Sequence, residues 1–282
     1  MNFLDILKAF LIGVIQGITE WLPISSTGHM ILFEQFCGMN VSEQFMEMFR
    51  VVIQFGSILA VVILYWKRLF PFCPSAGKAE RKSIWKLWLK IVIAVIPAGV
   101  VGVLFDDILD KYLYNYLYNY ITVAAALIIY GVAFIVIERM HKTKKYPITS
   151  VDDIDAKTAL KIGAFQTLSL IPGTSRSGST IIGAMCVGVS RTPAAEFSFF
   201  LAVPVMFGAS LLKIAKYAVN YGLAFSPSEI VTLVVGILTA FVVSLVAIKF
   251  LVGFVRRHSF EFFGWYRIVL GVAVIAYFLI TK

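Results

Sequence analysis

"QGITEWLPISSTGHM", residues 16–30, interrupts an apolar stretch of the chain with a run of polar side chains. Pro23 and Gly28 within it break any continuous helix. Polar, non-helical backbone at membrane depth is tolerated only where it is buried in protein or lines a wet cavity. The stretch therefore predicts a re-entrant helix–loop–helix hairpin, at about residues 4–33, that enters the membrane and returns to the side it left.

The composition of the chain indicates an integral membrane protein. Of its 282 residues, 60% are hydrophobic and 15% are charged, whereas soluble domains average about 45–50% and about 25%. The apolar runs are continuous, which favours spanning helices over a β-barrel. No cleavable signal peptide is evident, and the three cysteines are too scattered for a metal site or a disulfide framework. We expect an all-α polytopic membrane protein with six spans, at about residues 50–66, 88–105, 119–138, 195–216, 229–250 and 264–281.

A second interrupted stretch, at about residues 158–190, repeats the first. It contains "QTLSLIPGTSRSG" (166–178), which matches residues 16–28 in length, in its proline and in its Ser/Thr-rich loop, at an offset of 150 residues. We expect each half to be one re-entrant helical hairpin plus three transmembrane helices. The second half is then inverted, and an inverted-topology repeat brings its broken elements together near the bilayer midplane. Within a single integral membrane domain, 1–282, repeat 1 covers about 1–138, a cytoplasmic link about 139–157 and repeat 2 about 158–282.

The loop charges test this topology. If both hairpins return to the side they left, the basic loop residues fall together on one side: Lys67, Arg68, Lys78, Arg81, Lys82, Lys86, Arg139, Lys142, Lys144, Lys145, Lys157, Arg191, Arg256 and Arg257. The opposite side carries Glu34, Glu43, Glu47, Asp106, Asp107 and Asp110. The positive-inside rule places the basic side in the cytoplasm. We therefore expect both termini outside, with the first hairpin entering from outside and the second from the cytoplasm. Because the net charge of +9 is spread over separate loops, a nucleic-acid partner is not expected.

Glu20 is the first candidate functional residue. It lies four residues after Gln16, so the two side chains share one helix face. An ionisable group in the low-dielectric zone is costly and by default indicates a functional site. The alternative is a carboxylate neutralised by protonation or by a structural arginine.

The loop after Pro23 leads into a second short helix. Its hydroxyl-rich and glycine positions are Ser25, Ser26, Thr27 and Gly28. Such a loop suits an anion, because backbone N–H groups and the helix dipole point at the ligand, although a plain helix cap is the alternative. His29 follows directly. An imidazole, a hydroxyl and a carboxylate close together suit nucleophile activation or general acid–base catalysis, whereas a packing role for the imidazole is the alternative.

The loop of the second hairpin carries an arginine. Arg176 stands among hydroxyl residues and glycines, namely Thr174, Ser175, Ser177, Ser179, Gly173 and Gly178. An arginine at membrane depth needs a partner, and a guanidinium surrounded by hydroxyls is suited to bidentate phosphate binding. The alternative is an Arg176–Glu20 ion pair that only clamps the hairpins together. Both can hold in turn, with the pair present before ligand binds and phosphate on the arginine afterwards.

Two inverted loops would thus bring a carboxylate, an imidazole, a guanidinium and many hydroxyls to one place in the membrane. Phosphoryl or diphosphate chemistry fits these groups best, because it needs positioning, charge stabilisation and a nucleophile. A substrate that reaches such a site from the bilayer is a lipid. A lipid-phosphate flippase is the competing class, because inverted repeats with broken helices are also a transporter architecture. A purely structural scaffold leaves the buried charges unexplained.

Both motifs together resemble the undecaprenyl-diphosphate phosphatases of the bacitracin-resistance family, over essentially the whole chain. That family's first signature maps to Gln16, Glu20 and Pro23–His29, and its second, Pro-Gly-x-Ser-Arg-Ser-Gly, maps to Pro172–Gly178. The resemblance implies hydrolysis of undecaprenyl diphosphate to the monophosphate, which recycles the lipid carrier for cell-wall synthesis and gives bacitracin resistance. It also implies a bacterial inner-membrane location, an active site toward the outer, periplasmic face, and a divalent cation, Mg²⁺ or Ca²⁺.

The resemblance implies catalytic roles for Glu20, Ser26, His29 and Arg176. The substrate-binding set that we expect around them is Gln16, Ser25, Thr27, Gly28, Thr174, Ser175, Ser177 and Gly178. Many family members carry a glutamate where this chain has Gln16, and an amide is a poorer ligand for a hard cation than a carboxylate. Glu20 is then the expected metal ligand. The sequence leaves open whether Ser26 or water attacks phosphorus, and whether the chain forms a homodimer.

Overall fold

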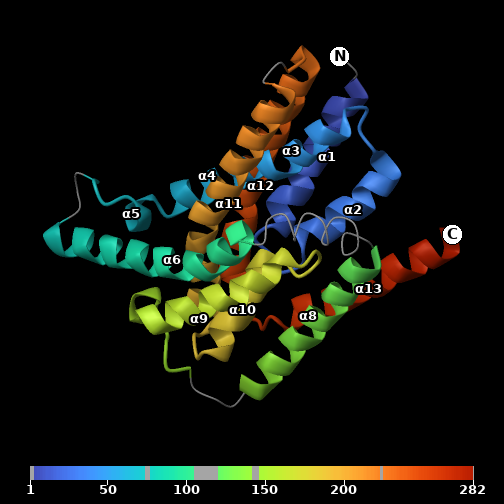
Figure 1. Ribbon diagram of the computed structural model, residues 1–282. Coiled ribbons are helices and arrows are strands. Elements are labelled where there is room, and N and C mark those ends of the chain that lie inside the picture. The colour runs from blue at the N-terminus through green and yellow to red at the C-terminus, as the bar shows by residue number, and fades with distance from the viewer. Residues whose placement is uncertain (1–2, 74–76, 105–119, 142–145, 223–224, 282) are drawn as a thin grey trace.

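The computed structural model describes residues 3–73, 77–104, 120–141, 146–222 and 225–281, and within these ranges the chain is helical (Figure 1). One isolated bridge, between Ile148 and Val189, is the only extended pairing in the described ranges. The helices are α1 (Phe3–Thr19), α2 (Ser26–Cys37), α3 (Glu43–Val52), α4 (Gln54–Leu64), α5 (Trp66–Leu69), α6 (Lys78–Leu104), α8 (Tyr120–His141), α9 (Ala156–Gln166), α10 (Arg176–Cys186), α11 (Arg191–Tyr221), α12 (Pro227–Val255) and α13 (Glu261–Thr281), with short 3₁₀ turns η2 (Val151–Asp153) and η3 (Thr167–Leu170).

Six helical segments of the described chain are long and apolar enough to cross a membrane, as the sequence predicts. They are Glu43–Leu64, Lys78–Gly102, Tyr120–Met140, Arg191–Tyr221, Pro227–Val255 and Glu261–Ile280. The first begins earlier than the predicted 50–66, because the amphipathic α3 precedes α4 and Ser42 caps its N-terminus by accepting a hydrogen bond from the N–H of Phe45. Both interrupted stretches form two helices joined by a polar loop: α1 and α2 in the first, α9 and α10 in the second.

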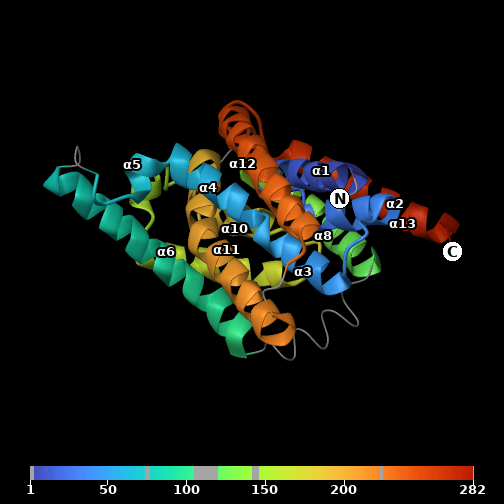
Figure 2. The same cartoon turned by 90° about the horizontal axis from the view of Figure 1, so that it is seen from above.

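The helices pack in a few long contacts. Helix α1 lies along α12, α8 along α13, and α10 lies between α9 and α11 (Figures 1 and 2). The α1–α12 contact depends on Gly13 and Gly17, since a Cβ at either position would lie within 3 Å of a carbonyl oxygen of α12, at Gly236 or Ala240. Close approach of backbones through small residues is a usual mode of helix packing in membranes. Because α1 ends just before the first polar loop, this contact positions that loop.

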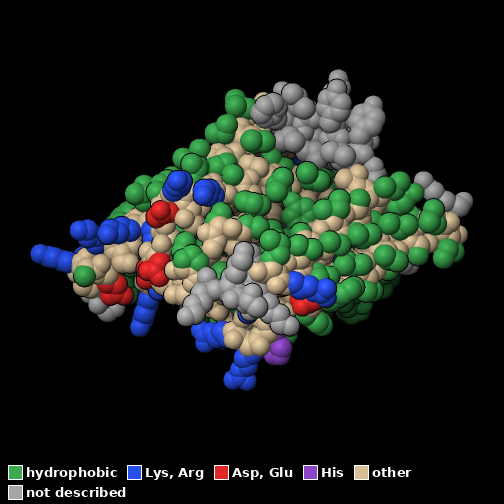
Figure 3. Space-filling model, turned by 90° about the horizontal axis from the view of Figure 1, so that it is seen from below, with side chains coloured by type: hydrophobic (Ala, Val, Ile, Leu, Met, Phe, Trp, Pro, Cys, Tyr) green, Lys and Arg blue, Asp and Glu red, His purple; other side chains and the backbone are tan. Residues whose placement is uncertain are grey.

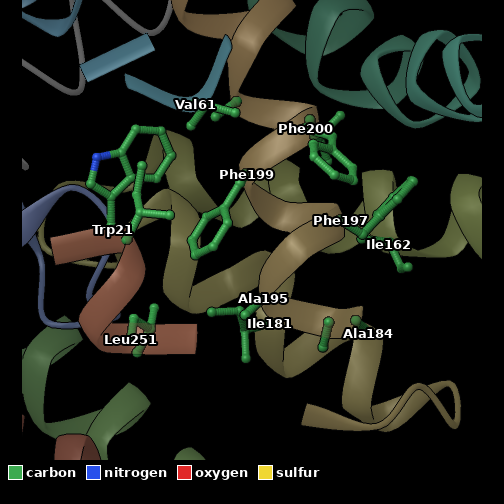
Figure 4. Close-up of a cluster of buried hydrophobic side chains, with 14 of the residues drawn as sticks. Trp21, Val61, Ile162, Ile181, Ala184, Ala195, Phe197, Phe199, Phe200 and Leu251 are labelled. Carbon is green, nitrogen blue, oxygen red and sulfur yellow. The ribbon is translucent and has the colours of Figure 1, made fainter. Parts of the chain in front are cut away.

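The hydrophobic core surrounds the two loops. Figure 4 shows Trp21, immediately before the first loop, facing Phe199 of α11, and their rings meet edge to face with centroids 5.3 Å apart. Ile181 of α10 lies in the same cluster and is fully buried. Because Trp21 and Ile181 flank the two polar loops, this packing holds both loops against α11.

The outward faces of the long helices are apolar, as expected for contact with lipid tails. Exposed large side chains on them include Leu59, Ile63, Val92, Ile96, Val132, Val136, Val234, Leu238, Val242 and Val246. Figure 3 shows hydrophobic side chains over much of one face, with Lys and Arg at the left end and along the lower part of the view. Exposed apolar surface on this scale is unusual for a soluble monomer.

Ion pairs connect loops that the sequence predicts on one side of the membrane. Arg68 pairs with Asp152 at 3.2 Å, and Arg191 at the start of α11 pairs with the buried Glu138 of α8 at 2.6 Å. The link between the halves therefore lies beside the loop after α4. Several predicted loop charges, namely Asp106, Asp107, Asp110, Lys142, Lys144 and Lys145, lie outside the described residues.

Candidate active site

The two polar loops have the same local backbone. Ser25 (φ 73°) and Ser175 (φ 74°) are the only non-glycine residues with positive φ in the described ranges. Each accepts a hydrogen bond on its side-chain oxygen from the N–H three residues later, at Gly28 (3.3 Å) and Gly178 (3.1 Å). A left-handed conformation costs a serine about 1–3 kcal/mol, and such strain persists where the surroundings impose it, commonly at functional sites. For the first loop the sequence offers a helix cap as the alternative, and it predicts neither the cap of the second loop nor the strain.

A buried ion pair joins the loops. Glu20 Oε1 lies 3.1 Å from Arg176 Nη2, and the two side chains are only 7% and 10% exposed. Arg176 Nη1 donates to the carbonyl of Ser198 on α11 at 2.8 Å, and its guanidinium lies over the ring of Trp21, 5.7 Å from the centroid. The ion pair that the sequence analysis weighs as the alternative to phosphate binding by Arg176 is therefore present. The attraction between the carboxylate and the guanidinium offsets the desolvation cost of burying each charge.

The second carboxylate oxygen of Glu20 holds the rest of the first loop. Glu20 Oε2 accepts from Gln16 Nε2 at 3.0 Å and from the Ser26 hydroxyl at 3.3 Å. From the other loop, the Ser177 hydroxyl donates to the Glu20 carbonyl at 3.0 Å. The expected approach of Gln16, Ser26 and Glu20 is therefore present, and Ser177 serves to fasten the two loops together.

A cavity of about 270 Å³ lies between the loops. Its walls come from four parts of the chain: Glu20, Ser26 and Thr27 of the first loop, Ser169, Ile171, Pro172, Gly173, Ser175 and Arg176 of the second, Gln54 of α4, and Val205, Met206 and Ala209 of α11. One wall is polar and charged, and the α11 wall is apolar. This size suits a head group, and the apolar wall suits the beginning of a hydrocarbon chain.

Several predicted site residues support the cavity without lining it. Gln16, Ser25, Gly28, Thr174, Ser177 and Gly178 are outside the lining set. Their roles in the structure are the caps and the hydrogen bonds described above, together with a carbonyl of Thr174 that is bound by Arg267. These six residues shape the loops, and the predicted residues that line the cavity itself are Glu20, Ser26, Thr27, Ser175 and Arg176.

His29 forms its hydrogen bonds away from Ser26 and Glu20, the residues that it is predicted to assist. Its Nδ1 lies 2.7 Å from the carbonyl oxygen of Ser25, and its Nε2 lies 2.7 Å from the hydroxyl of Tyr266 on α13. The two rings stack, with an interplanar angle of 6°. His29 is absent from the cavity lining, and its two ring nitrogens lie against the Ser25 carbonyl and the Tyr266 hydroxyl.

Donors for a divalent cation are few at this site. The part of the chain that the structure describes contains no group of three His, Cys, Asp or Glu side chains able to hold a metal ion. Gln16 Oε1 is buried and has no hydrogen-bond partner. One carboxylate and one spare amide oxygen fit a cation that is held mainly by phosphate oxygens, which is the usual mode for Mg²⁺.

Comparison with known proteins gives consistent results. A family model described as bacitracin resistance protein BacA matches residues 9–273. The chain belongs to this family. It is similar to the undecaprenyl-diphosphatase of Acetivibrio thermocellus, with 54% identity over 99% of this chain and 100% of the relative. It is 52% identical to the undecaprenyl-diphosphatase of Enterococcus faecalis and 53% identical to undecaprenyl-diphosphatase 1 of Clostridium acetobutylicum, each over the full length of both chains. Family membership and the six apolar helices together make the chain a multi-pass membrane protein.

The structure adds residues that the sequence analysis missed. Gln54 and Ser169 line the cavity, and Tyr266 and Arg267 of α13 contact the loops. Arg267 offered a sequence signal, since it is a charged residue within the apolar run 262–280. Tyr266 offered none, because an exposed tyrosine in a membrane helix is common near the interface.

Proposed function

We propose that the protein is a membrane phosphatase that hydrolyses undecaprenyl diphosphate to undecaprenyl phosphate and inorganic phosphate. The observation that carries the proposal is the Glu20–Arg176 pair with the Ser26 hydroxyl beside it, at a cavity between two strained loops. Relatives that are at least 52% identical over nearly the whole chain are named undecaprenyl-diphosphatases. The product re-enters cell-wall synthesis as lipid carrier, and its recycling gives resistance to bacitracin.

Arg176 holds the diphosphate in this proposal. Its Nε is buried without a hydrogen-bond partner, while Nη2 is bound to Glu20. Both nitrogens become available to phosphate oxygens when the terminal phosphate displaces the carboxylate. A planar guanidinium binds phosphate through two parallel N–H groups, which fixes orientation as well as charge. The N–H groups at the start of α10 add to this anion site.

Glu20 takes the proton of the nucleophile. Its Oε2 already accepts the hydrogen bond of Ser26, so a carboxylate released from Arg176 is placed to act as the base. Ser26 then attacks the terminal phosphorus, the bond to the bridging oxygen breaks, and undecaprenyl phosphate leaves; water hydrolyses the phosphoserine. If water attacks directly, Ser26 orients it. We assign the base to Glu20 ahead of His29, because both ring nitrogens of His29 are engaged elsewhere.

A divalent cation, Mg²⁺ or Ca²⁺, would be held by Glu20, by the unpartnered Oε1 of Gln16 and by the diphosphate itself. When bound, it neutralises charge on the phosphate oxygens and the leaving group. Gln16 keeps the carboxylate of Glu20 oriented through its Nε2 hydrogen bond whether or not the cation is present.

Release of phosphate by the purified protein in detergent tests the proposal. Wild-type protein releases phosphate from a polyprenyl diphosphate, whereas Glu20→Ala and Arg176→Ala variants that remain folded do not. Arg139→Ala serves as the matched control, since it breaks an exposed ion pair with Glu261. Wild-type turnover in the Arg176 variant refutes the mechanism. Substantial turnover in Ser26→Ala selects water as the nucleophile. Phosphate release with and without a chelator shows whether the reaction needs a divalent cation. Because detergent leaves no two-sided bilayer, phosphate release also separates this proposal from a flippase.

We also propose that both interrupted stretches are re-entrant hairpins of an inverted repeat. The entry and exit of the first hairpin meet, since Lys8 Nζ donates to the carbonyl of Gly38 at 2.5 Å and the N–H of Asn40 donates to Asp5 at 3.3 Å. In the second, the segment before α9 pairs with the segment after α10 through Ile148 and its neighbours. The matching φ angles at the two loops support the repeat.

This topology gives the proposed orientation in the bacterial inner membrane. The basic loops face the cytoplasm by the positive-inside rule, and the α1–α2 hairpin enters from the opposite side. The cavity then receives its substrate from the outer face. Labelling of a single cysteine introduced at Asn40 by an impermeant thiol reagent in intact cells, with the native cysteines replaced by serine, tests the orientation. Protection of that cysteine until the cells are opened would contradict it.

A further inference from the structure

Arg267 is a buried charge that the proposed chemistry does not use. It lies within α13, has no exposed surface, and belongs to the span Glu261–Ile280. A guanidinium stays protonated in proteins, and an unpaired charge at membrane depth is among the most costly groups a chain can bury. In the ranges that the structure describes, no carboxylate forms an ion pair with Arg267. Its retention therefore requires an explanation from its actual contacts.

The contacts of Arg267 are carbonyl oxygens of both polar loops. Nη1 donates to Pro23 of the first loop at 3.1 Å. Nη2 donates to Gly173 at 3.0 Å and Thr174 at 2.9 Å, both in the second loop. A longer contact of 3.5 Å reaches Ala126 of α8, and the guanidinium lies over the ring of Tyr130, 5.6 Å from the centroid. One planar group thus spans both halves of the proposed active site.

The bound carbonyls lie next to the reacting residues in the chain. Pro23 precedes Ser26 by three residues, and Thr174 precedes Arg176 by two. In a trans peptide the C=O and N–H groups point in opposite directions. With the carbonyl of Thr174 turned toward Arg267, the N–H of Ser175 points away from it, and Ser175 lines the cavity. Arg267 thereby sets both the separation of the loops and the direction of a loop N–H.

We propose that Arg267 is a positioning residue for the phosphatase reaction, which holds Ser26 and Arg176 at the spacing that in-line attack on a bound diphosphate requires. Arg267 is absent from the cavity lining, so it acts through the loops and not on the substrate. The inference rests on the proposed function. A simple structural strut would support folding alone, whereas a positioning residue changes the rate of the chemical step in protein that is fully folded.

Arg267→Lys is the direct test. An ammonium keeps the charge and donates three hydrogen bonds, but from one point, so it cannot span the first-loop and second-loop carbonyls as the guanidinium fork does. We expect kcat per folded protein to fall roughly 10- to 100-fold, which is the scale for a misplacement of about 1 Å. KM should stay within about threefold, because Arg176 still binds the phosphate. The probe is a short-chain polyprenyl diphosphate in detergent.

Arg191→Lys is the matched control. It makes the same replacement at a partly buried arginine that is bound to Glu138 and is absent from the cavity lining. A lower thermal midpoint with unchanged kcat is expected there. Three outcomes overturn the proposal. They are an unchanged kcat in Arg267→Lys, an equal fall of kcat in both variants, and an effect of Arg267→Lys on KM alone. If wild type itself releases no phosphate, the proposed function fails and not only this inference.

A second variant keeps the test decisive if Arg267→Lys does not fold. A Cβ added at Gly178 would lie 3.3 Å from Arg267 Nη1 and 3.2 Å from Ser175 Cβ. Gly178→Ala therefore presses on the guanidinium while leaving its charge in place. Its kcat should fall with KM nearly constant. The same criteria then decide, with Gly99→Ala on α6 as its control, because a Cβ there would meet nothing nearer than Val95 at 4.0 Å.

Discussion

Replacement of Glu20 by glutamine removes a negative charge and keeps the size of the side chain. In the wild type the carboxylate lies 3.1 Å from Arg176, and both side chains are about nine-tenths buried. The variant leaves a buried guanidinium whose remaining described acceptor is the carbonyl of Ser198. Loss of one partner from a buried pair costs about 3–5 kcal/mol. We take the lower figure, about 3 kcal/mol, because the new amide oxygen still accepts a hydrogen bond.

The assay is the thermal unfolding midpoint of detergent-purified protein. At about 2–4 °C per kcal/mol for a chain of this size, Glu20→Gln should lower Tm by about 6–12 °C. Glu261→Gln is the matched control. It makes the same substitution in a pair with the 62%-exposed Arg139, where the expected cost is below about 1 kcal/mol.

A non-hydrolysable diphosphonate sharpens the test. It brings negative charge to Arg176, and in the wild type it must compete with Glu20. We therefore expect the diphosphonate to raise Tm more in Glu20→Gln than in the wild type. If Glu20→Gln melts no lower than Glu261→Gln, the carboxylate is not what neutralises Arg176. If the diphosphonate stabilises the variant less than the wild type, the exchange of carboxylate for phosphate is refuted.

Three further predictions concern contacts around the site. Tyr266→Phe removes the hydroxyl that lies 2.7 Å from His29 Nε2 and should lower the stability by about 1 kcal/mol. An unchanged Tm would contradict that hydrogen bond. Phosphate release should not fall, because the substitution frees the imidazole. Gly56→Ala drives a methyl group into the backbone carbonyl of Ile237 on α12 and should cost about 3 kcal/mol, seen as a loss of monodisperse protein on size exclusion. Gly178→Ala should lower Tm more than Gly28→Ala, because only the former is crowded; equal midpoints would contradict the difference between the loops.

The sequence predicted those features that local pattern or energetic cost determines. The six spans follow from length and hydropathy, and both broken stretches follow from proline, glycine and hydroxyl residues within apolar runs. The pairing of Glu20 with Arg176 follows from cost, since each buried charge requires a partner.

The remaining features depend on contacts between distant parts of the chain. Arg267 binds Pro23 across 244 positions, and His29 meets Tyr266 across 237. The residue pattern within one segment does not predict which carbonyl or hydroxyl group of a distant segment will lie beside it. The sequence predicts His29 beside Ser26 and Glu20, but in the structure its Nε2 meets Tyr266 of α13, a helix that packs along α8.

The place of Arg267 near the end of the chain has a consequence for biosynthesis. Synthesis proceeds from the N-terminus, so both loops exist before the helix that carries their shared guanidinium is made. A nascent chain that ends before α13 already holds Glu20 and Arg176, but the carbonyls of Pro23, Gly173 and Thr174 still lack that donor. If Arg267 has the positioning role proposed above, insertion of α13 is the step that completes the active site, and the shorter nascent chain is expected to be an incompetent phosphatase.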